Sequence, residues 1–521
     1  MIHQISILIK KSRNLLLLVI VIIAGFLFGC GHKPNTSVKI ANPVSPNIIF
    51  VLTDDHRFDA MGFMDHPFLE TPNMDKMAEE GIHFDRALVT TSLCSPSRAS
   101  ILSGMYAHNH GVVNNYNPVD STLKFFPEYL QDAGYNTAFI GKWHMGGETD
   151  DPQRGFDYWL SFKGQGTYWA DGHGTSRVVP QTSMDGYNVN GNRIPQKGYI
   201  TDELTDFAMK WLEDYTDKRP FMLYLSHKAV HSDFVASDRH LGRYKDVQLA
   251  LPSTYHIEKG KPMWLINQRN SRHGAEFGYN LSDFDLNKYY RRYCESLLAV
   301  DENLGRIMDW VENSDEAENT IVIYMGDNGF QFGEHGLIDK RTAYEASIKV
   351  PLLIWKPGHN PKNKVISEAV ANIDIAPTIL DLVGISIPGN MDGQSFKPLM
   401  DGENVVWRKE LLYEYYWERN YPYTPTTHAL LTDRYKFIRY QGIWDLDEFY
   451  DMQKDPDETR NLINDENYQE LIGRYRFRMF ELLRETNGNT IPLLPDKGNT
   501  FILRDPEKSE PAEFPESFYQ K

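Results

Sequence analysis

Residues 47–55 read NIIFVLTDD, and residues 319–329 follow the same design as NTIVIYMGDNG. Each segment is a continuous apolar run with several β-branched members, a pattern that favours a strand buried on both faces of a parallel sheet. In doubly wound α/β proteins, ligands bind beyond the carboxyl ends of such strands. The two segments therefore predict an α/β fold with a mostly parallel central sheet flanked by helices, and a site where these strands end.

Polar side chains follow both apolar runs. Asp54 and Asp55 come directly after the first run, and Asp327 and Asn328 come after the second. An acidic turn after a strand would explain either pair alone. Together, three carboxylates and a carboxamide form an oxygen-only ligand set, which suits a hard cation such as Ca²⁺ or Mg²⁺.

The most specific motif lies at residues 91–104, which read TSLCSPSRASILSG. Cys94 stands two residues before Pro96 and is followed by Ser97 and Arg98. This pattern resembles the signature Cys-x-Pro-Ser-Arg of the formylglycine-dependent sulfatases, which belong to the alkaline phosphatase superfamily. A buried, inert cysteine at the start of a helix is the alternative, because short motifs recur by chance.

Two further motifs match that family in its own order. Residues 136–144, NTAFIGKWH, predict a short strand whose alternation places Lys142 and His144 on one face. Lys340, in the stretch DKRTAYE, matches the second active-site lysine of the family. Both motifs resemble sulfatase signatures, although a lysine among charged neighbours is usually solvated surface.

A histidine pair follows a predicted strand at residues 220–226. The pair is His227 and His231, in the stretch HKAVH. Two histidines four residues apart bind zinc when they share a helix, but this segment leaves a strand, so a metal pair is disfavoured. The resemblance places the catalytic histidine at His231.

The resemblance implies a sulfuric ester hydrolase with one Ca²⁺ per chain. A formylglycine-generating enzyme or an anaerobic sulfatase-maturating enzyme would oxidise Cys94 to 3-oxoalanine, whose hydrate supplies the nucleophile. The implied metal ligands are Asp54, Asp55, Cys94, Asp327 and Asn328. The implied catalytic roles are sulfate binding by Lys142 and Lys340, orientation of the nucleophile by Arg98, leaving-group protonation by His231 and removal of the second hydroxyl proton by His144.

Two other functions remain open at this point. One is a hydrolase of phosphate or phosphonate monoesters from the same superfamily, which would use a similar metal site. The other is a glycan-binding surface protein that has lost catalysis. If the sulfatase function holds, the expected substrate is a sulfated polysaccharide or oligosaccharide, either an algal polymer such as ulvan or a glycosaminoglycan.

The N-terminal segment predicts export as a lipoprotein. Three cations precede an apolar run at residues 15–28, and Cys30 follows in the context Leu-Phe-Gly-Cys, which resembles a bacterial lipobox. We expect a signal peptide at residues 1–29, lipidation of Cys30 and an outer-membrane location. A transmembrane anchor is the alternative, but the run falls short of the roughly 20 residues needed to span a bilayer.

The length of the chain and a change in its residue pattern near residue 405 predict two domains after a tether at residues 30–45. The catalytic domain is expected at residues 46–404, with long loops at residues 161–199 and a long helix at residues 286–313 that buries Cys294. Residues 405–521 are expected to form a smaller α+β subdomain with an antiparallel sheet.

Charge limits the possible partners. The 521 residues carry a formal net charge of −17, with 41% hydrophobic and 24% charged residues, as in a globular protein. Such a surface repels nucleic acid, so no nucleic-acid partner is expected. A sulfated polymer would be repelled at long range too, so its sulfate groups require a local basic pocket.

Overall fold

The computed structural model describes residues 45–146, 149–174, 185–271, 285–358, 362–492 and 513–519. The predicted signal peptide, the lipidated Cys30 and the tether up to residue 44 lie outside these residues. Within the described part of the chain, no helix combines the length and apolar character that a membrane crossing requires. The described residues from 45 onward belong to one compact unit.

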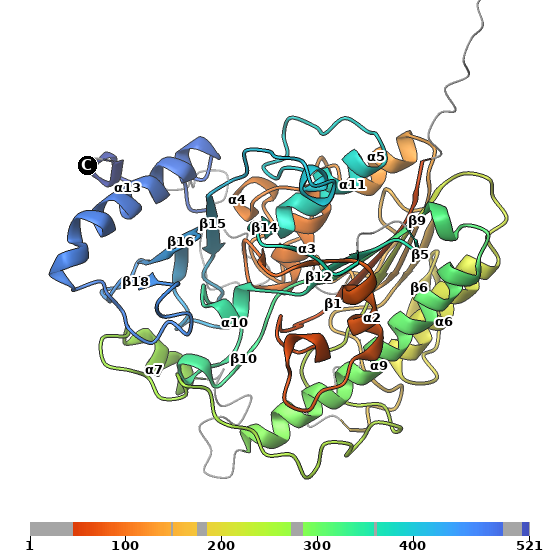
Figure 1. Cartoon of the computed structure of the whole chain (residues 1–521), viewed down its shortest axis with the longest axis horizontal. Coiled ribbons are helices and arrows are strands. Elements are labelled where there is room, and N and C mark those ends of the chain that lie inside the picture. The colour runs from red at the N-terminus through yellow and green to blue at the C-terminus, as the bar shows by residue number, and fades with distance from the viewer. Residues whose placement is uncertain are drawn as a thin grey trace, which may run out of the picture. The chain divides into compact units, whose positions relative to one another are not determined.

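A ten-stranded sheet organises this unit, with the strand order β13-β2-β12-β9-β1-β8-β4-β5-β6-β7 (Figure 1). The five central strands from β9 to β5 are all parallel, while β12, β6 and β7 run antiparallel to neighbouring strands. The predicted fold class is confirmed. The strands are β1 (Asn47–Thr53), β2 (Ile82–Phe84), β4 (Asn136–Gly141), β5 (Tyr158–Ser161), β6 (Tyr187–Val189), β7 (Asn192–Ile194), β8 (Phe221–Ser226), β9 (Thr320–Gly326), β12 (Leu352–Trp355) and β13 (Lys364–Ile366).

Strand β1 shows why its sequence has no polar alternation. All seven of its residues are buried. Successive side chains of the strand point to opposite faces of the sheet. Ile48, Phe50 and Leu52 belong to the hydrophobic cluster on one face, and Ile49 and Val51 belong to the cluster on the other. Each fully buried side chain of this size stabilises the fold by about 1.5–3 kcal/mol, so both faces of the strand contribute to the core.

Helices cover both faces of the sheet (Figure 1). On the face of Ile49 and Val51 lie α2 (Pro72–Glu80), α6 (Ile200–Glu213) and α9 (Leu286–Asn313). On the opposite face lie α3 (Cys94–Ser103), α5 (Phe126–Asp132) and α11 (Ile375–Leu382). The long helix predicted at residues 286–313 has these bounds in the structure, and Cys294 is buried in it as a free thiol.

A four-stranded antiparallel sheet follows in the C-terminal part of the chain. Its strands are β15 (Glu410–Tyr415), β16 (Thr426–Thr432), β17 (Tyr435–Gln441) and β18 (Glu448–Asp451), and α13 (Gln469–Glu485) packs on it. This sheet confirms the expected small antiparallel element. Because one hydrophobic cluster includes both Phe50 of the large sheet and Phe437 of the small one, the proposed domain boundary at residue 405 stays a prediction.

Short elements complete the described structure. They are β3 (Ala87–Leu88) paired with β14 (Val370–Ala371), β10 (Gln331–Phe332) paired with β11 (Ile338–Asp339), and the helices α4 (Ala107–His110), α7 (Trp264–Arg269), α10 (Glu345–Ile348) and α12 (Lys397–Met400).

The region predicted as long loops contains a hairpin that the sequence analysis missed. Strands β6 and β7 pair antiparallel across Asn190 and Gly191, both of which have positive φ, at 49° and 87°. An Asn-Gly pair between two extended segments is the signal for this two-residue turn. The strands are only three residues long, so their alternation is too short to detect.

One buried ion pair links α4 to the small sheet. The His108 Nδ1 lies 2.7 Å from Glu414 Oε2, and its Nε2 lies 2.8 Å from the carbonyl oxygen of Thr486. Both partners are acceptors, so both ring nitrogens carry protons and the imidazole is charged. Burial lowers the pKa of His108, but the interaction with Glu414 outweighs burial and raises the pKa above its ordinary value near 6.5.

We expect the variant His108→Gln to destabilise the protein, because it leaves Glu414 as a buried charge without its partner, a loss of about 3–5 kcal/mol. A raised pKa in the folded state means that this contribution is full below pH 6.5 and is lost as the pH rises through the folded pKa. Denaturant unfolding midpoints measured from pH 6 to 9 should therefore converge for the variant and the parent at alkaline pH. His256→Gln, at an exposed histidine, is the control. Parallel curves for His108→Gln and the parent would contradict the charged pair.

Candidate active site

The site begins where β1 and β9 end side by side. Thr53 pairs with Gly326 in the parallel register, so the polar residues after both strands start as neighbours. The backbone N–H of Asp327 donates to the carbonyl oxygen of Thr53 at 2.9 Å, and the N–H of Asp55 donates to Asp327 Oδ1 at 3.0 Å. The structure therefore brings together four of the five predicted metal ligands, Asp54, Asp55, Asp327 and Asn328, and the fifth, Cys94, lies beside them.

Three buried carboxylates are paired with three buried cations at this site. Each of Asp54, Asp55 and Asp327 has no solvent-exposed surface. The pairs are Asp54 with Lys142, Asp55 with Lys340 at 2.5 and 2.6 Å, and Asp327 with Arg98 at 2.9 Å. An unpaired charge would be too costly to bury, so each side of these pairs requires the other.

The carboxylates also act on one another. Burial raises the pKa of Asp55 to about 7, against the effect of Lys340, and the neighbouring Asp54 and Asp327 contribute to the rise. Burial opposes ionisation of Asp54 as well, but Lys142, His231 and Arg98 hold its pKa well below the usual range. The carboxylates therefore lie close enough together to influence one another's ionisation.

The chemistry of the donor atoms fits a hard divalent cation. One oxygen from each of Asp54, Asp55 and Asp327 lies within 4.8 Å of the others. The Nδ2 group of Asn328 donates to Asp55 Oδ1 at 2.6 Å and to the carbonyl oxygen of Gly329 at 2.8 Å. Its Oδ1 is buried and has no hydrogen-bond partner in the described structure, so it is available as a fourth oxygen ligand.

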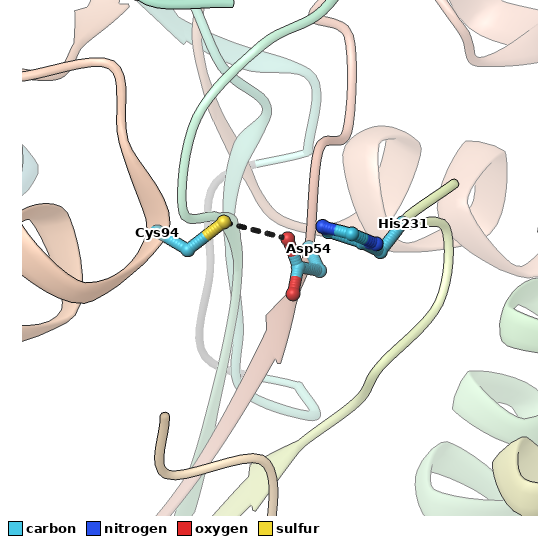
Figure 2. A group of neighbouring side chains, drawn as sticks. All are labelled: Asp54, Cys94 and His231. Atoms are coloured by element: carbon cyan, nitrogen blue, oxygen red, sulfur yellow. Dashed lines mark hydrogen bonds between the residues drawn. The ribbon is translucent and has the colours of Figure 1, made fainter. Parts of the chain in front are cut away.

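Cys94 is the first residue of α3 and lies beside this cluster. Its Sγ donates to Asp54 Oδ1 at 3.4 Å, and Figure 2 shows the Asp54 carboxylate between Cys94 and His231. Burial and the nearby Asp54 charge raise the pKa of the Cys94 thiol above its ordinary value. An unmodified Cys94 is therefore protonated at neutral pH and is a weak nucleophile.

Arg98 lies one helical turn after Cys94, so both side chains face the site. Besides Asp327, its guanidinium binds Asp54 Oδ2 at 3.3 Å, the carbonyl oxygen of Lys142 at 2.8 Å and Ser226 Oγ at 2.6 Å. These contacts join α3 to the ends of β1, β4, β8 and β9, which fixes the position of Cys94.

Lys142 and His144 both reach the site, but the predicted strand alternation is wrong. Strand β4 ends at Gly141, where a Cβ atom would lie 1.8 Å from the carbonyl oxygen of Ser226. This close approach of β4 to β8 requires glycine, whose φ here is 124°, and it turns the chain out of the strand. His144 has a positive φ of 63°, so local backbone turns deliver both side chains.

Gln165 is a site residue that the sequence analysis missed. A lysine ammonium can only donate, so the Gln165 atom 2.6 Å from Lys142 Nζ is the oxygen Oε1. The amide nitrogen then faces His144 Nε2 at 2.9 Å, and this ring nitrogen must carry the lone pair. The proton of His144 is therefore on Nδ1, which lies 3.2 Å from Ser95 Oγ. Gln165 lies in an irregular loop, and no motif marks it.

The structure distinguishes the two candidate histidines. His231 Nε2 lies 4.0 Å from Asp55 Oδ2, and its Nδ1 donates to the carbonyl oxygen of Ser232 at 2.6 Å. Burial, reinforced by Lys142 and Lys340, holds the pKa of His231 well below its usual value. Burial lowers the pKa of His227 to about 4, but the charge acting on it is Asp202 of α6 rather than the carboxylate cluster. The geometry therefore places His231 in the site.

Comparison with known proteins identifies the family. The family model described as Sulfatase matches residues 46–385, and the model described as N-sulphoglucosamine sulphohydrolase, C-terminal, matches residues 333–485. An N-acetylglucosamine-6-O-sulfatase from Bacteroides thetaiotaomicron is 31% identical, over 95% of this chain and 94% of that protein. An ulvan-active sulfatase from Formosa agariphila is 27% identical, over 89% of this chain and 86% of that protein.

A solved structure agrees with these relatives. It is a protein in complex with its substrate D-glucosamine-2-N,6-O-disulfate, with 30% sequence identity and a TM-score of 0.74, and the match covers 85% of this chain and 99% of that one. With a family model that spans most of the chain and a relative above 30% identity over nearly its whole length, this protein belongs to the sulfatase family of enzymes, on the alkaline-phosphatase-like fold.

Proposed function

We propose that this sulfatase removes a 6-O-sulfate group from a glucosamine residue of a sulfated glycan. The observation that carries the reaction type is the placement of Cys94 against the carboxylate cluster, with Lys142, Lys340 and Arg98 around it. The sugar is supported by the 31% identical N-acetylglucosamine-6-O-sulfatase and by the similar structure that holds a glucosamine disulfate.

Cys94 is proposed to act as formylglycine, since its unmodified thiol is buried and protonated. Once oxidised, residue 94 would supply a hydrated aldehyde whose hydroxyl group attacks the sulfur. The enzyme that performs this oxidation is a required partner. Arg98, fixed by four hydrogen-bonding partners, would hold this residue in line with the ester.

Ca²⁺ is the proposed cofactor. Asp54, Asp55, Asp327 and Asn328 would hold it, since their oxygens converge and Asn328 Oδ1 has no other partner among the described residues. When bound, it would supply positive charge for the sulfate oxygens and for the ionised nucleophile.

The two lysines are placed to bind the sulfate group. Lys142 and Lys340 approach the cluster from different loops and bind Asp54 and Asp55 respectively. Because an ammonium has three donor protons, each lysine can keep its carboxylate and still donate to a sulfate oxygen. In a site without water, such preorganised donors stabilise developing charge strongly.

Two histidines are proposed to move protons. His231 is anchored through Nδ1–H to the carbonyl oxygen of Ser232, so Nε2 is the ring nitrogen left for catalysis. The negative charge of a bound sulfate ester would favour a proton on Nε2, and Nε2 would then pass that proton to the leaving sugar oxygen. His144 carries its lone pair on Nε2 and can accept the proton of the second hydroxyl group, which expels sulfate. The Gln165 amide occupies this lone pair, so it must move aside at that step.

We also propose that the protein is an exported lipoprotein, anchored to the outer membrane through Cys30. The support is the sequence of residues 1–30 alone: cations, an apolar run and a cysteine in a lipobox-like context. This location suits an enzyme that acts on a polymer too large to enter the cell.

The function is tested with protein made alongside a maturating enzyme. We expect the peptide that contains Cys94 to lose mass by the thiol-to-aldehyde difference, and the protein to release sulfate from N-acetylglucosamine 6-sulfate. Cys94→Ala should be inactive, because no nucleophile remains. The panel should include ulvan oligosaccharides and the phosphate ester matched to the sulfate ester. Faster turnover of the phosphate ester would refute a sulfatase, and full activity with an unmodified Cys94 would refute the nucleophile.

The acid role of His231 depends on the leaving group. His231→Ala should lose about 10²–10⁴-fold in kcat/KM on a sulfated sugar, whose alcohol is a poor leaving group, and much less on an activated aryl sulfate. His227→Ala is the matched control, and its losses should not differ between the two substrates. Equal losses on both substrates for His231→Ala would assign it to sulfate binding instead.

Gln165 should act as a positioning residue through His144 and Lys142. We expect Gln165→Leu to lower kcat by about 10–100-fold, the usual effect of an outer partner, with a smaller change in KM. Gln165→Glu places a negative charge beside His144, so the limb of the pH–kcat profile that reports this histidine should move to higher pH. Gln153→Leu, at a glutamine whose side chain donates to the carbonyl oxygen of Asp151, is the control. An unshifted profile in Gln165→Glu would contradict the contact.

A further inference from the structure

Three different kinds of metal ligand meet beside the carboxylate cluster. They are the thiol of Cys94, the imidazole of His231 and the carboxylate of Asp54, and their ligand atoms lie within 4.8 Å of one another (Figure 2). All three residues are buried. The proposed calcium ligands, Asp54, Asp55, Asp327 and Asn328, offer only oxygen donors. The second set adds a nitrogen and a sulfur donor, so it prefers a different metal, although Asp54 belongs to both sets.

His231 is already in the form that binds a metal. Its Nδ1–H donates to the carbonyl oxygen of Ser232 at 2.6 Å, which leaves the lone pair on Nε2. Metal-bound histidines commonly hold their second ring nitrogen in such a bond to a backbone carbonyl, which fixes both the tautomer and the ring. The Nε2 atom is directed toward the carboxylates, as its 4.0 Å distance to Asp55 Oδ2 shows.

The distances suit a tetrahedral ion. Zinc bonds of about 2.0–2.3 Å place neighbouring ligand atoms about 3.3–3.6 Å apart. Cys94 Sγ and Asp54 Oδ1 have this separation, at 3.4 Å. The imidazole has to close only part of the distance, since the three ligand atoms already lie within 4.8 Å of one another. It is also the member of the set with the most exposed side chain, at 11% against 0% for Asp54. This leaves a fourth position for water.

We propose that, as long as Cys94 remains a thiol, this cluster binds a thiophilic divalent cation such as Zn²⁺ through Cys94 Sγ, His231 Nε2 and Asp54 Oδ1. The S–H bond breaks, a Zn–S bond forms and the proton leaves to solvent, with no change of oxidation state. Zinc replaces the hydrogen bond between Cys94 and Asp54 with two stronger contacts.

Maturation then changes the metal preference of the site, an extension that depends on the proposed function. Oxidation of Cys94 to an aldehyde removes the sulfur ligand, and the oxygen donors that remain favour Ca²⁺. Because both sets use Asp54, the two cations compete. The unmatured chain would therefore exchange calcium for zinc, whereas the mature chain would not.

The test uses full-length protein purified with Cys94 unmodified, as the mass of its peptide confirms. Zn²⁺ is titrated against a chromophoric chelator, and Co²⁺ is added separately to follow the absorption of a cobalt–sulfur bond. We expect one high-affinity zinc ion per chain and a cobalt–sulfur band. Cys94→Ser and His231→Gln should each weaken zinc binding by more than the roughly 10–100-fold that loss of an outer partner costs.

Matched controls exist for both ligands. Cys294→Ser changes the other buried cysteine, and His227→Gln changes the histidine four residues before His231. Both should retain zinc binding and the cobalt–sulfur band, and unfolding midpoints establish that every variant is folded. High-affinity binding that survives in Cys94→Ser and His231→Gln would overturn the proposal, as would its absence from the unmodified parent.

The outcome also separates this proposal from the proposed function. If the mature protein hydrolyses sulfate esters but the unmodified chain binds no zinc, the zinc site alone is wrong. If zinc binds as expected but activity does not need an oxidised Cys94, the zinc site stands and the proposed nucleophile is wrong. Zinc binding that persists at equal strength in the formylglycine form would refute the change of metal preference.

Discussion

The structure depends on the pairing of three buried carboxylates with three buried cations where β1 and β9 end. Asp54, Asp55 and Asp327 cannot be buried as anions without cationic partners. These partners are Lys142 and Lys340, from two loops, and Arg98, from helix α3. The charges thus hold the ends of β4 and β8, the start of α3 and the segment before α10 in one arrangement. The groups that stabilise this region are thus the same ones that are proposed to bind the sulfate group.

The sequence was most informative where one physical requirement governs several residues in a row. The apolar runs of β1 and β9 predicted central parallel strands, because only a strand covered on both faces lacks polar positions. Helix α9 is 28 residues long, so its apolar stripe recurs over many turns, and the bounds of the helix were predicted correctly. The convergence of Asp54, Asp55, Asp327 and Asn328 could be predicted for a similar reason, since parallel strands end at one edge of the sheet.

Features that depend on a single contact could not be predicted. Strand β4 stops at Gly141 because of the backbone of β8, which is a neighbour only in the fold, so the alternation of Lys142 and His144 was wrongly inferred. Gln165 matters because Lys142 and His144 both lie against its amide, and its own loop shows no pattern. The spacing of His227 and His231 fits either residue, so His231 was assigned from the family resemblance, and the fold adds its position near Asp55.

The complete burial of Cys94 bears on whether the chain can fold before the proposed modification of this cysteine. The contacts that enclose it join residues far apart, such as Asp55 and Lys340, which are separated by 285 positions. Such long-range pairing forms late in folding. If Cys94 is oxidised as proposed, the modifying enzyme would therefore have to reach it while the chain is still open, before the segment around β9 has joined β1. The yield of active protein would then depend on the relative rates of folding and oxidation.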